Sequence, residues 1–241
     1  MSLHGLNLQH LSFGYGADPV LKNVTFSVER GSFCALFGPN GAGKTSLFSL
    51  LTRLVTTPTG RIEIAGIDLQ KSPRAALAKM GIVFQQMTLD LDLSVRRNLS
   101  YYAALRGLSG REAERRIDAA LDRLDLMDRA KVRARDLNGG HRRRTEIARA
   151  LLHDPEILFL DEPTVGLDPA SRAAITEHVH ALCAEDGSTV LWATHLMDEV
   201  RPEDDLVILD RGEVLAHDTA SRIAGDRSIE QVFLEMTSAA T

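Results

Sequence analysis

The chain has 241 residues, and its 28 lysines and arginines against 33 aspartates and glutamates give a formal net charge of −5. This length suits one large domain or two small ones. A composition of 44% hydrophobic and 25% charged residues is typical of a folded globular protein and excludes a mainly disordered chain. The acidity argues against a nucleic-acid partner, which usually meets a basic face, and 5% aromatic residues argue against a platform for stacking bases.

The sequence also carries no sign of export or membrane insertion. Its first residues lack a basic segment followed by an apolar stretch, so no secretory signal is predicted. No apolar run approaches the roughly 20 residues that a membrane span needs. Cys34 and Cys183 lie far apart and form neither a disulfide framework nor a metal quartet, so we expect a reducing, intracellular compartment.

The first third of the chain predicts strands and then a strand–loop–helix unit. Residues 6–13 and 20–28 show the apolar alternation of strands, on either side of a Tyr-Gly-Ala-Asp-Pro turn. The apolar run 32–37 predicts a buried strand, and it leads through a glycine-rich loop into residues 44–54, which have helical spacing. Two further predictions follow: a hairpin-like pair around 61–66 and a short buried strand at 82–84.

Between residues 90 and 153 the chain becomes rich in arginine, alanine and leucine. Apolar residues recur there at helical intervals, with Ser94 and Ser109 in place to act as N-caps. The predicted helices cover residues 94–106, 111–124 and 142–152. This segment therefore predicts a helical insertion within an α/β core.

After residue 153 the alternation of strand and helix resumes. Strands are predicted at 157–160, 189–193 and 206–209, helices at 169–184 and 229–236, and a hairpin at 210–213. The predicted fold class is α/β, with a mainly parallel sheet and an antiparallel β region at the N-terminus. We expect one domain over 1–241, with an α/β core formed by 1–89 and 154–241 and a helical subdomain formed by 90–153.

The glycine-rich loop matches the pattern G-x-x-x-x-G-K-[ST], in which each residue type has a task. Glycines let backbone N–H groups wrap a phosphate, and the following helix adds the positive end of its dipole. Lys44 reaches the β- and γ-phosphates, and the hydroxyl of Thr45 ligates Mg²⁺. The predicted nucleotide-binding residues of the loop are Gly38, Pro39, Asn40, Gly41, Ala42, Gly43, Lys44, Thr45 and Ser46.

A phosphate loop needs an acidic partner for the metal, and the strand at 157–160 supplies one. It ends in two carboxylates, Asp161 and Glu162. Asp161 is placed to hold Mg²⁺, directly or through water. Glu162, one residue further, could polarise a water aimed at the γ-phosphate.

A second set of motifs narrows the interpretation. The run Leu-Asn-Gly-Gly-His-Arg-Arg-Arg at 137–144 resembles the signature motif of ATP-binding cassette (ABC) proteins, and other elements of that family fall in the expected order. They are Tyr15 before the phosphate loop, Gln85 after the strand at 82–84, Val-Gly-Leu-Asp ending at Asp168, and His195 after the strand at 189–193. The chain therefore resembles the ATPase subunit of an ABC transporter, which implies the ABC ATPase fold with a P-loop NTPase core.

This resemblance implies roles for further residues. Two ABC ATPase subunits dock head to tail, so the signature residues Asn138, Gly139 and Gly140 would contact the γ-phosphate of ATP held by the partner. His195 would contact the same phosphate, and Gln85 would reach Mg²⁺ or the attacking water. The remaining nucleotide contacts implied are Tyr15, stacked on adenine, and Asp168.

The resemblance also implies partners and a place in the cell. ATP and Mg²⁺ are the expected cofactors, and an integral-membrane permease and a second ATPase subunit, identical or different, are the expected partners. The chain would be cytoplasmic, on the inner face of the cell membrane. Within the family it resembles the drug-, nodulation- and haem-exporter-like branch, and there the ATPase subunits associated with pyrroloquinoline-quinone-dependent alcohol dehydrogenase systems.

Some features keep simpler interpretations open. Tyr15 could cap the first hairpin, Gln85 could be a surface amide, and His195 an ordinary polar residue at a strand end. The arginines at 142–144 are expected to form a solvated helix face rather than a nucleic-acid patch. Asn138 and His141 depart from the Ser and Gln of the usual signature.

Two other functions stay open for the whole chain. One is a soluble ABC ATPase without a role in transport, which would typically carry two cassettes or a long coiled coil. The other is a cassette of low activity that binds ATP chiefly to hold a dimer, which the unusual signature motivates. The intact pair Glu162 and His195 argues against the second.

Overall fold

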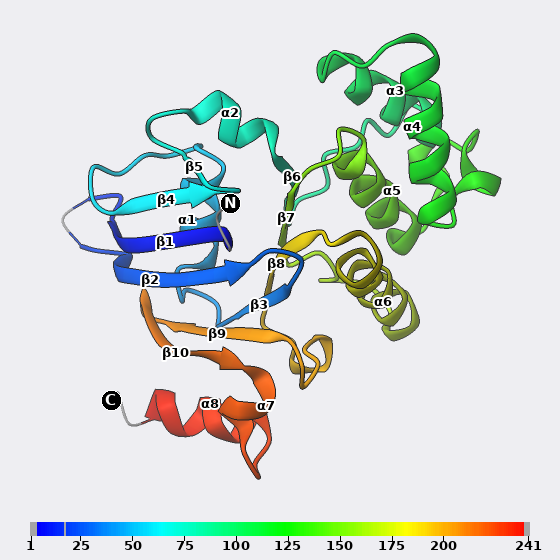
Figure 1. The fold of residues 1–241 in the computed structure, drawn as a ribbon. Coiled ribbons are helices and arrows are strands. Elements are labelled where there is room, and N and C mark those ends of the chain that lie inside the picture. The colour runs from blue at the N-terminus through cyan, green and yellow to red at the C-terminus, as the bar shows by residue number, and fades with distance from the viewer. Residues whose placement is uncertain (1–3, 17, 239–241) are drawn as a thin grey trace.

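The computed structural model describes residues 4–16 and 18–238 of the chain, and Figure 1 shows their path. The strands are β1 (His4–Phe13), β2 (Leu21–Glu29), β3 (Phe33–Phe37), β4 (Arg61–Ile64), β5 (Ile67–Asp68), β6 (Met80–Val83), β7 (Ile157–Asp161), β8 (Thr189–Thr194), β9 (Asp205–Asp210) and β10 (Glu213–Thr219). The helices are α1 (Lys44–Leu51), α2 (Pro73–Ala78), α3 (Val95–Leu105), α4 (Gly110–Arg123), α5 (Gly139–Leu151), α6 (Pro169–Asp186), α7 (Ala220–Ala224) and α8 (Ile229–Ser238).

The larger sheet has the strand order β10-β9-β3-β8-β7-β6. In this order, adjacent strands from β9 through β3, β8 and β7 to β6 are parallel. The edge strand β10 runs antiparallel to β9. The carboxyl ends of the parallel strands therefore meet at one edge of the sheet, where loops from distant parts of the sequence come together.

The smaller sheet is antiparallel, with the order β2-β1-β4-β5. Strand β1 pairs with β2 on one side and with β4 on the other, and irregularities in its register with β2 bend it. Figure 1 shows this sheet lying against one side of the larger sheet, with α1 between them.

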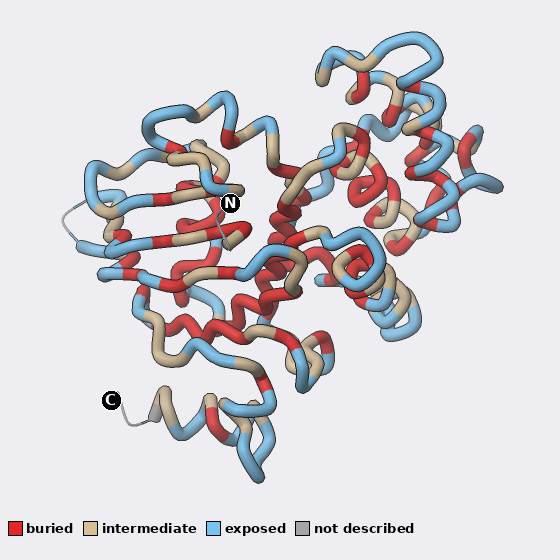
Figure 2. The backbone as a smooth tube through the Cα atoms, viewed as in Figure 1, coloured by how far each residue is buried: buried red, intermediate tan, exposed pale blue. Residues whose placement is uncertain are grey.

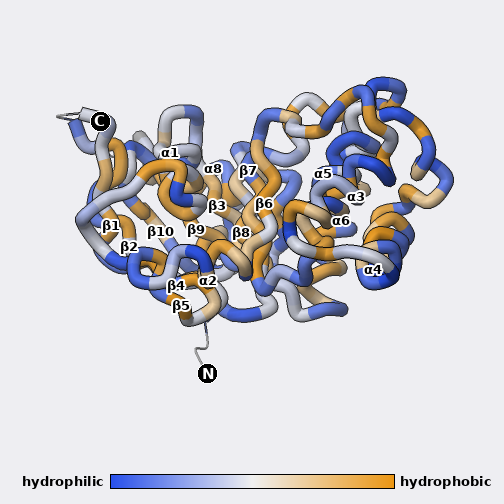
Figure 3. Tube along the Cα trace, turned by 90° about the horizontal axis from the view of Figure 1, so that it is seen from above, coloured by the Kyte–Doolittle hydropathy of each residue, from blue (hydrophilic) through white to orange (hydrophobic). Residues whose placement is uncertain are grey.

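Both faces of the larger sheet are buried, as Figure 2 shows for its central strands. Along β3, Cys34 and Leu36 join the core beneath α1 and the small sheet. Phe33, Ala35 and Phe37 join a second core with helices α3 to α6. Burial on both sides explains why these strands read as continuous apolar runs rather than as alternating ones, and in Figure 3 they form the hydrophobic centre.

Helices α3, α4 and α5 pack on one another at the end of the molecule opposite the small sheet (Figure 1). Ser94 caps α3, because its hydroxyl accepts a hydrogen bond from the backbone N–H of Arg97 at 3.3 Å. Ser109 occupies the N-cap position of α4 but makes no such hydrogen bond. Ser94 therefore fixes the start of its helix through its side chain, and Ser109 does not.

The predicted α/β fold with a mainly parallel sheet and an N-terminal antiparallel region is confirmed. The sequence did not indicate α2 or α7, both of which are short. Helix α1 ends at Leu51 rather than at residue 54, because Arg53 takes a left-handed backbone with φ +58°. No helix among the described residues is both long and apolar enough to cross a membrane.

Candidate functional site

Four neighbouring strands deliver the predicted catalytic groups to one edge of the larger sheet. Strand β3 leads into the phosphate loop, and its neighbour β8 leads into His195. Strand β7, next to β8, ends in Asp161 and is followed by Glu162, and the edge strand β6 leads to Gln85. These groups lie far apart in the sequence, and the parallel strand order makes them neighbours.

The phosphate loop follows β3 and ends in α1. Gly43 stands at the N-cap of α1 with φ +109°, a conformation that other residues rarely adopt, and a Cβ there would lie 2.8 Å from Leu21. No side chain caps this helix, and its first turn contains no acidic residue. The free N–H groups and the helix dipole therefore suit an anion. The hollow beside the loop is lined by Val20, Pro39, Asn40, Gly41, Gly43, Lys44, Thr45, Ser46, Gln85 and Glu162.

The carboxylate of Glu162 is the centre of this group. It is 8% exposed, and its Oε1 lies 3.2 Å from Nζ of Lys44 and 3.4 Å from Nδ1 of His195. Its Oε2 accepts a hydrogen bond of 3.0 Å from Nε2 of Gln85. Lys44 also donates to the backbone oxygens of Gly38 at 2.7 Å and Pro39 at 3.2 Å. The structure thus brings the predicted base, Glu162, into direct contact with Lys44, which is predicted to bind phosphate, and with the side chains of Gln85 and His195.

Asp161, the last residue of β7, directly precedes Glu162 and is 5% exposed. Burial first, and then the neighbouring carboxylate of Glu162, raise the pKa of Asp161 to about 6, while Lys44 and Arg143 lower it. A divalent cation beside Asp161 would therefore relieve an unfavourable charge.

The donor set around Asp161 fits Mg²⁺. In the described ranges no group of three or more His, Cys, Asp or Glu side chains could hold a metal by itself. Mg²⁺ is instead usually held by one or two carboxylates together with substrate phosphates. Asp161, the hydroxyl of Thr45 and the amide oxygen of Gln85 offer the oxygen ligands that this ion prefers.

The signature residues lie on the other face of the sheet. Asn138 caps α5, because its Oδ1 accepts hydrogen bonds from the backbone N–H of His141 at 2.8 Å and from the ring Nδ1 of His141 at 2.7 Å. Helix α5 belongs to the core opposite the one that holds α1. Asn138 does not line the phosphate-loop hollow of its own chain, and neither do the two glycines that follow it.

The loop that ends at Asp168 packs on the signature. Asp168 caps α6 by accepting a hydrogen bond of 2.9 Å from the N–H of Ser171. A Cβ added at Gly139 would lie 2.9 Å from Leu167, and one at Gly140 would lie 2.7 Å from the hydroxyl of Ser171. The glycines therefore allow this close approach, and Asp168 has a structural role in its own chain.

Tyr15 lies at the surface, 67% exposed, with its ring edge-on to Phe13 at 4.9 Å. Val20, rather than Tyr15, lines the hollow beside the phosphate loop. The exposed ring is free to stack on a base, so its predicted contact with adenine stays a prediction.

The expectation that residues 142–144 form a solvated face is wrong. Arg143 is 4% exposed and donates hydrogen bonds to the backbone oxygens of Phe84 at 2.7 Å and Gln85 at 2.9 Å. It also pairs at 2.8 Å with Glu146, which is fully buried. Glu146 in turn accepts a hydrogen bond from the N–H of Thr88 at 2.7 Å. This pair ties α5 to the loop of Gln85.

The sequence contains one signal for this buried pair, but the run of arginines at 142–144 makes it hard to recognise. Arg143 and Glu146 have an i, i+3 spacing, and Glu146 shares a helix face with the buried Ala150. A charged pair on the apolar face of a helix indicates a buried polar contact. The backbone oxygen of Phe84, which accepts from Arg143, however lies about sixty residues away in the sequence, and the pattern of the helix alone does not identify it.

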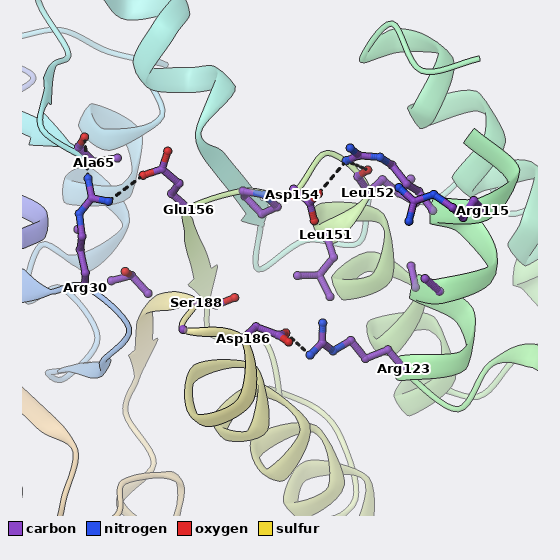
Figure 4. Close-up of a pocket in the computed structure, with 17 residues that line it drawn as sticks. Arg30, Ala65, Arg115, Arg123, Leu151, Leu152, Asp154, Glu156, Asp186 and Ser188 are labelled. Atoms are coloured by element: carbon purple, nitrogen blue, oxygen red, sulfur yellow. Dashed lines mark hydrogen bonds and ion pairs between the residues drawn. The ribbon is translucent and has the colours of Figure 1, made fainter. Parts of the chain in front are cut away.

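A larger cavity, of about 490 Å³, lies at the opposite edge of the sheet, where β7 and β8 begin (Figure 4). Four arginines of the described residues line it, of which Arg115 pairs with Glu112 outside the cavity and the other three pair with acids of the cavity. These pairs are Arg30 with Glu156 at 3.3 Å, Arg116 with Asp154 at 3.2 Å, and Arg123 with Asp186. Because each of these arginines already has an acidic partner, the cavity suits an anion less well than the phosphate loop does.

Known proteins that resemble this chain are ATP-binding proteins of one family. The ABC transporter family model matches residues 21–165. The linearmycin resistance ATP-binding protein LnrL of Bacillus subtilis (strain 168) is 38% identical over 230 residues, covering 93% of this chain and 74% of that protein. Nod factor export ATP-binding protein I of Rhizobium meliloti (strain 1021) is 38% identical over 212 residues, covering 88% of this chain and 63% of the relative.

Solved structures agree with these relatives. An ATP-binding subunit of an ABC transporter has a TM-score of 0.83 at 31% identity, covering 96% of this chain and 99% of that one. A dimeric ATP-binding cassette in a post-hydrolysis state, bound to ADP and Pi, has a TM-score of 0.77 at 28% identity. That match covers 89% of this chain and 98% of the other.

Proposed function

The chain belongs to the ABC transporter family of ATP-binding proteins, and on this basis we propose that it drives a separate membrane permease that exports its substrate. As an ABC ATPase it binds and hydrolyses ATP. The observation that supports this site most directly is the carboxylate of Glu162, which contacts Lys44, His195 and Gln85 at once.

In the proposed reaction, each group at the strand ends has one task. The phosphate loop holds the β- and γ-phosphates through its N–H groups and Lys44, with Thr45 and Ser46 at the start of α1. Asp161, with Thr45 and Gln85, would hold Mg²⁺, which neutralises charge that develops on the phosphates. Glu162 polarises the attacking water, and His195 contacts the γ-phosphate and orients the same water.

We propose that a second ATPase subunit completes each nucleotide site. The signature glycines and the phosphate loop lie on opposite sides of the larger sheet, so one chain does not bring them together. Head-to-tail pairing of two chains would place Asn138, Gly139 and Gly140 on the γ-phosphate held by the partner. Symmetric pairing of identical chains is the commoner arrangement. The related cassette bound to ADP and Pi is dimeric.

The chain is proposed to act on the cytoplasmic face of the cell membrane, through a permease. The division into a core of residues 1–89 and 154–241 and a helical subdomain of 90–153 is part of the proposal, with the subdomain as the permease-facing part. Export is favoured by the relatives, whose names state linearmycin resistance and Nod factor export. The association with pyrroloquinoline-quinone-dependent alcohol dehydrogenase systems also stays a proposal.

The proposal is tested by identifying any multi-span membrane protein encoded beside this chain and co-expressing the two. The pair is purified in detergent, reconstituted into proteoliposomes and assayed for ATP hydrolysis, beside the chain alone and beside the complex carrying Lys44→Ala. We expect the permease to co-purify and to raise hydrolysis severalfold, and the Lys44→Ala complex to assemble without hydrolysing. A chain that binds no permease and hydrolyses at the same rate in its presence would indicate a soluble ABC ATPase instead.

A further inference from the structure

The carboxylate of Glu199 is buried and held by neutral hydrogen-bond donors. Glu199 is 2% exposed and accepts hydrogen bonds from Nε1 of Trp192 at 3.0 Å and from the hydroxyl of Thr194 at 2.5 Å. The hydroxyl of Thr164 donates the third. A buried carboxylate without such partners would be costly, so these three donors stabilise it in place.

Two of these donors belong to the segments that carry the groups at the strand ends. Thr164 follows Glu162 by two residues, and Thr194 directly precedes His195. The hydroxyl of Thr194 also accepts a hydrogen bond of 2.9 Å from the N–H of Leu196. The chain is thus fixed on both sides of His195, and one carboxylate joins that segment to the segment of Glu162.

The backbone at Glu162 needs this support. Its φ of +46° lies in the left-handed region, which is strained for a residue with a side chain. Such a conformation persists only where the surroundings determine it. Its N–H donates to the oxygen of Ala193 at 3.0 Å, and its own oxygen accepts from Val165 at 3.3 Å. The hydrogen bond from Thr164 to Glu199 adds a side-chain connection just beyond this turn.

We propose that Glu199 is a positioning residue for ATP hydrolysis. Through Thr164 and Thr194 it holds the two segments in register, so that Glu162 and His195 meet at 3.4 Å and can orient the same water. The proposal rests on the roles proposed above for Glu162 and His195. It predicts that Glu199 controls the rate of hydrolysis while leaving the affinity for ATP unchanged.

The third donor provides a built-in reporter. Trp192 is the single tryptophan of the chain, it is fully buried in β8, and its indole N–H donates to Glu199. In protein labelled with ¹⁵N-tryptophan, the one indole resonance therefore reports whether the Glu199 hydrogen bonds are intact. This readout does not depend on hydrolysis.

The main test compares Glu199→Gln with Glu203→Gln, which changes an exposed glutamate in the same region. Glutamine keeps the size of Glu199 but turns one acceptor into a donor that faces other donors. We expect kcat to fall by about ten- to a hundredfold, with KM and the Kd for ATP within about threefold of wild type and a shifted indole resonance. Glu203→Gln should match wild type in all four. Wild-type kcat in a folded Glu199→Gln with a shifted resonance would overturn the proposal.

A double-mutant cycle separates positioning from a general structural role. Because Glu199 positions His195 as well as Glu162, Glu199→Gln should lower kcat by a clearly smaller factor in a His195→Ala background than in the wild-type chain. Loss by the full single-mutant factor in that background would overturn the proposal. Should Glu199→Gln fail to fold, Thr164→Val and Thr194→Val each remove one donor. Each should lower kcat about fivefold at unchanged Kd, and wild-type kcat in both would overturn the proposal.

These assays use the purified full chain and its own hydrolysis, without a permease. A failure of the transport proposal would appear as a permease that does not bind or does not stimulate the chain. A failure of the present inference would appear as unchanged kcat in the Glu199 and threonine variants. The two results are therefore distinguishable.

Discussion

The ammonium group of Lys44 lies 3.2 Å from the carboxylate of Glu162, and both side chains are buried. A γ-phosphate that enters the phosphate loop has to replace Glu162 as the main anionic partner of Lys44. Binding of ATP would then free a carboxylate oxygen of Glu162 to accept a hydrogen bond from water. In the proposed mechanism, this exchange would link nucleotide binding to the activation of Glu162 as the base.

Removal of the Lys44 charge should weaken ATP binding and stop hydrolysis. The phosphate loop has N–H donors, but they carry no full charge, and Lys44→Ala also leaves Glu162 without its cation. We expect kcat to fall by at least about 100-fold, measured by phosphate release, with a weaker Kd by calorimetry. Lys22→Ala, which alters a partly exposed lysine paired with Glu213, is the control and should match wild type. Unchanged hydrolysis in Lys44→Ala would mean that the phosphate loop is misassigned.

Substitutions of Asn138 separate helix capping from contact with nucleotide. Serine and aspartate can both accept the hydrogen bond from the N–H of His141, so both variants should unfold close to the wild-type midpoint. Asn138→Ser should keep hydrolysis. Asn138→Asp should nearly abolish it, because the new carboxylate would face a phosphate at the desolvated dimer interface. Full activity in Asn138→Asp would show that the signature does not dock on nucleotide during turnover.

The raised pKa of Asp161 predicts two effects of pH. Its pKa rises from 3.8 unfolded to about 6 folded, so the folded state binds this proton more tightly and loses stability as pH rises from about 4 to 6. The loss should be on the order of 2–3 kcal/mol and absent in Asp161→Asn, as measured by urea unfolding without Mg²⁺. Activation by Mg²⁺ should also require more of the ion below pH 6. An unchanged Mg²⁺ requirement between pH 5 and 8 would argue against Asp161 as its ligand.

The buried pair of Arg143 and Glu146 should show strong coupling. Arg143→Met leaves the fully buried carboxylate of Glu146 with only the more distant Arg149, at 3.8 Å, which should cost about 3–5 kcal/mol of unfolding free energy. Arg143→Met combined with Glu146→Leu should recover much of this stability, yet it should still lower hydrolysis because the carbonyl of Gln85 loses its anchor. Arg144→Met, on the same helix, is the control. Equal stability of single and double variants would show that the pair is not coupled.

The parts of the fold that depend on short sequence patterns were predicted well. The strand–loop–helix unit ending at Lys44 and the acidic strand end at Asp161 both carry local signals, an apolar run followed by glycines or by acids. The family resemblance supplied His195 and Gln85 by their order in the chain. The structure then brought these residues into contact because β8, β7 and β6 are adjacent in the sheet.

The parts that the sequence did not predict depend on long-range contacts. Arg143 stands in an arginine run that resembles an exposed face, and only the packing of α5 against the loop of Gln85 buries it. Glu199 likewise shows no pattern of its own, because its donors come from three separate positions. Helix α1 ends early because Arg53 has a left-handed backbone, and no glycine or proline at that position indicates this end in the sequence.

The central claim is that Glu162 activates the water while adding little to the affinity for ATP. Glu162→Gln keeps the shape and hydrogen bonds of the side chain but removes the base, and it releases Lys44 for the phosphates. Two chains would then stay bridged by uncleaved nucleotide. The control is the wild-type chain, which should cleave its ATP and stay monomeric under the same conditions.

The most direct test is size-exclusion chromatography with light scattering on Glu162→Gln and wild type, each with Mg²⁺-ATP and with Mg²⁺-ADP. We expect kcat to fall by at least about 100-fold in Glu162→Gln, and we expect Mg²⁺-ATP, but not Mg²⁺-ADP, to shift this variant from monomer to dimer. Hydrolysis by Glu162→Gln at the wild-type rate would contradict the account, because it would remove Glu162 from the catalytic role.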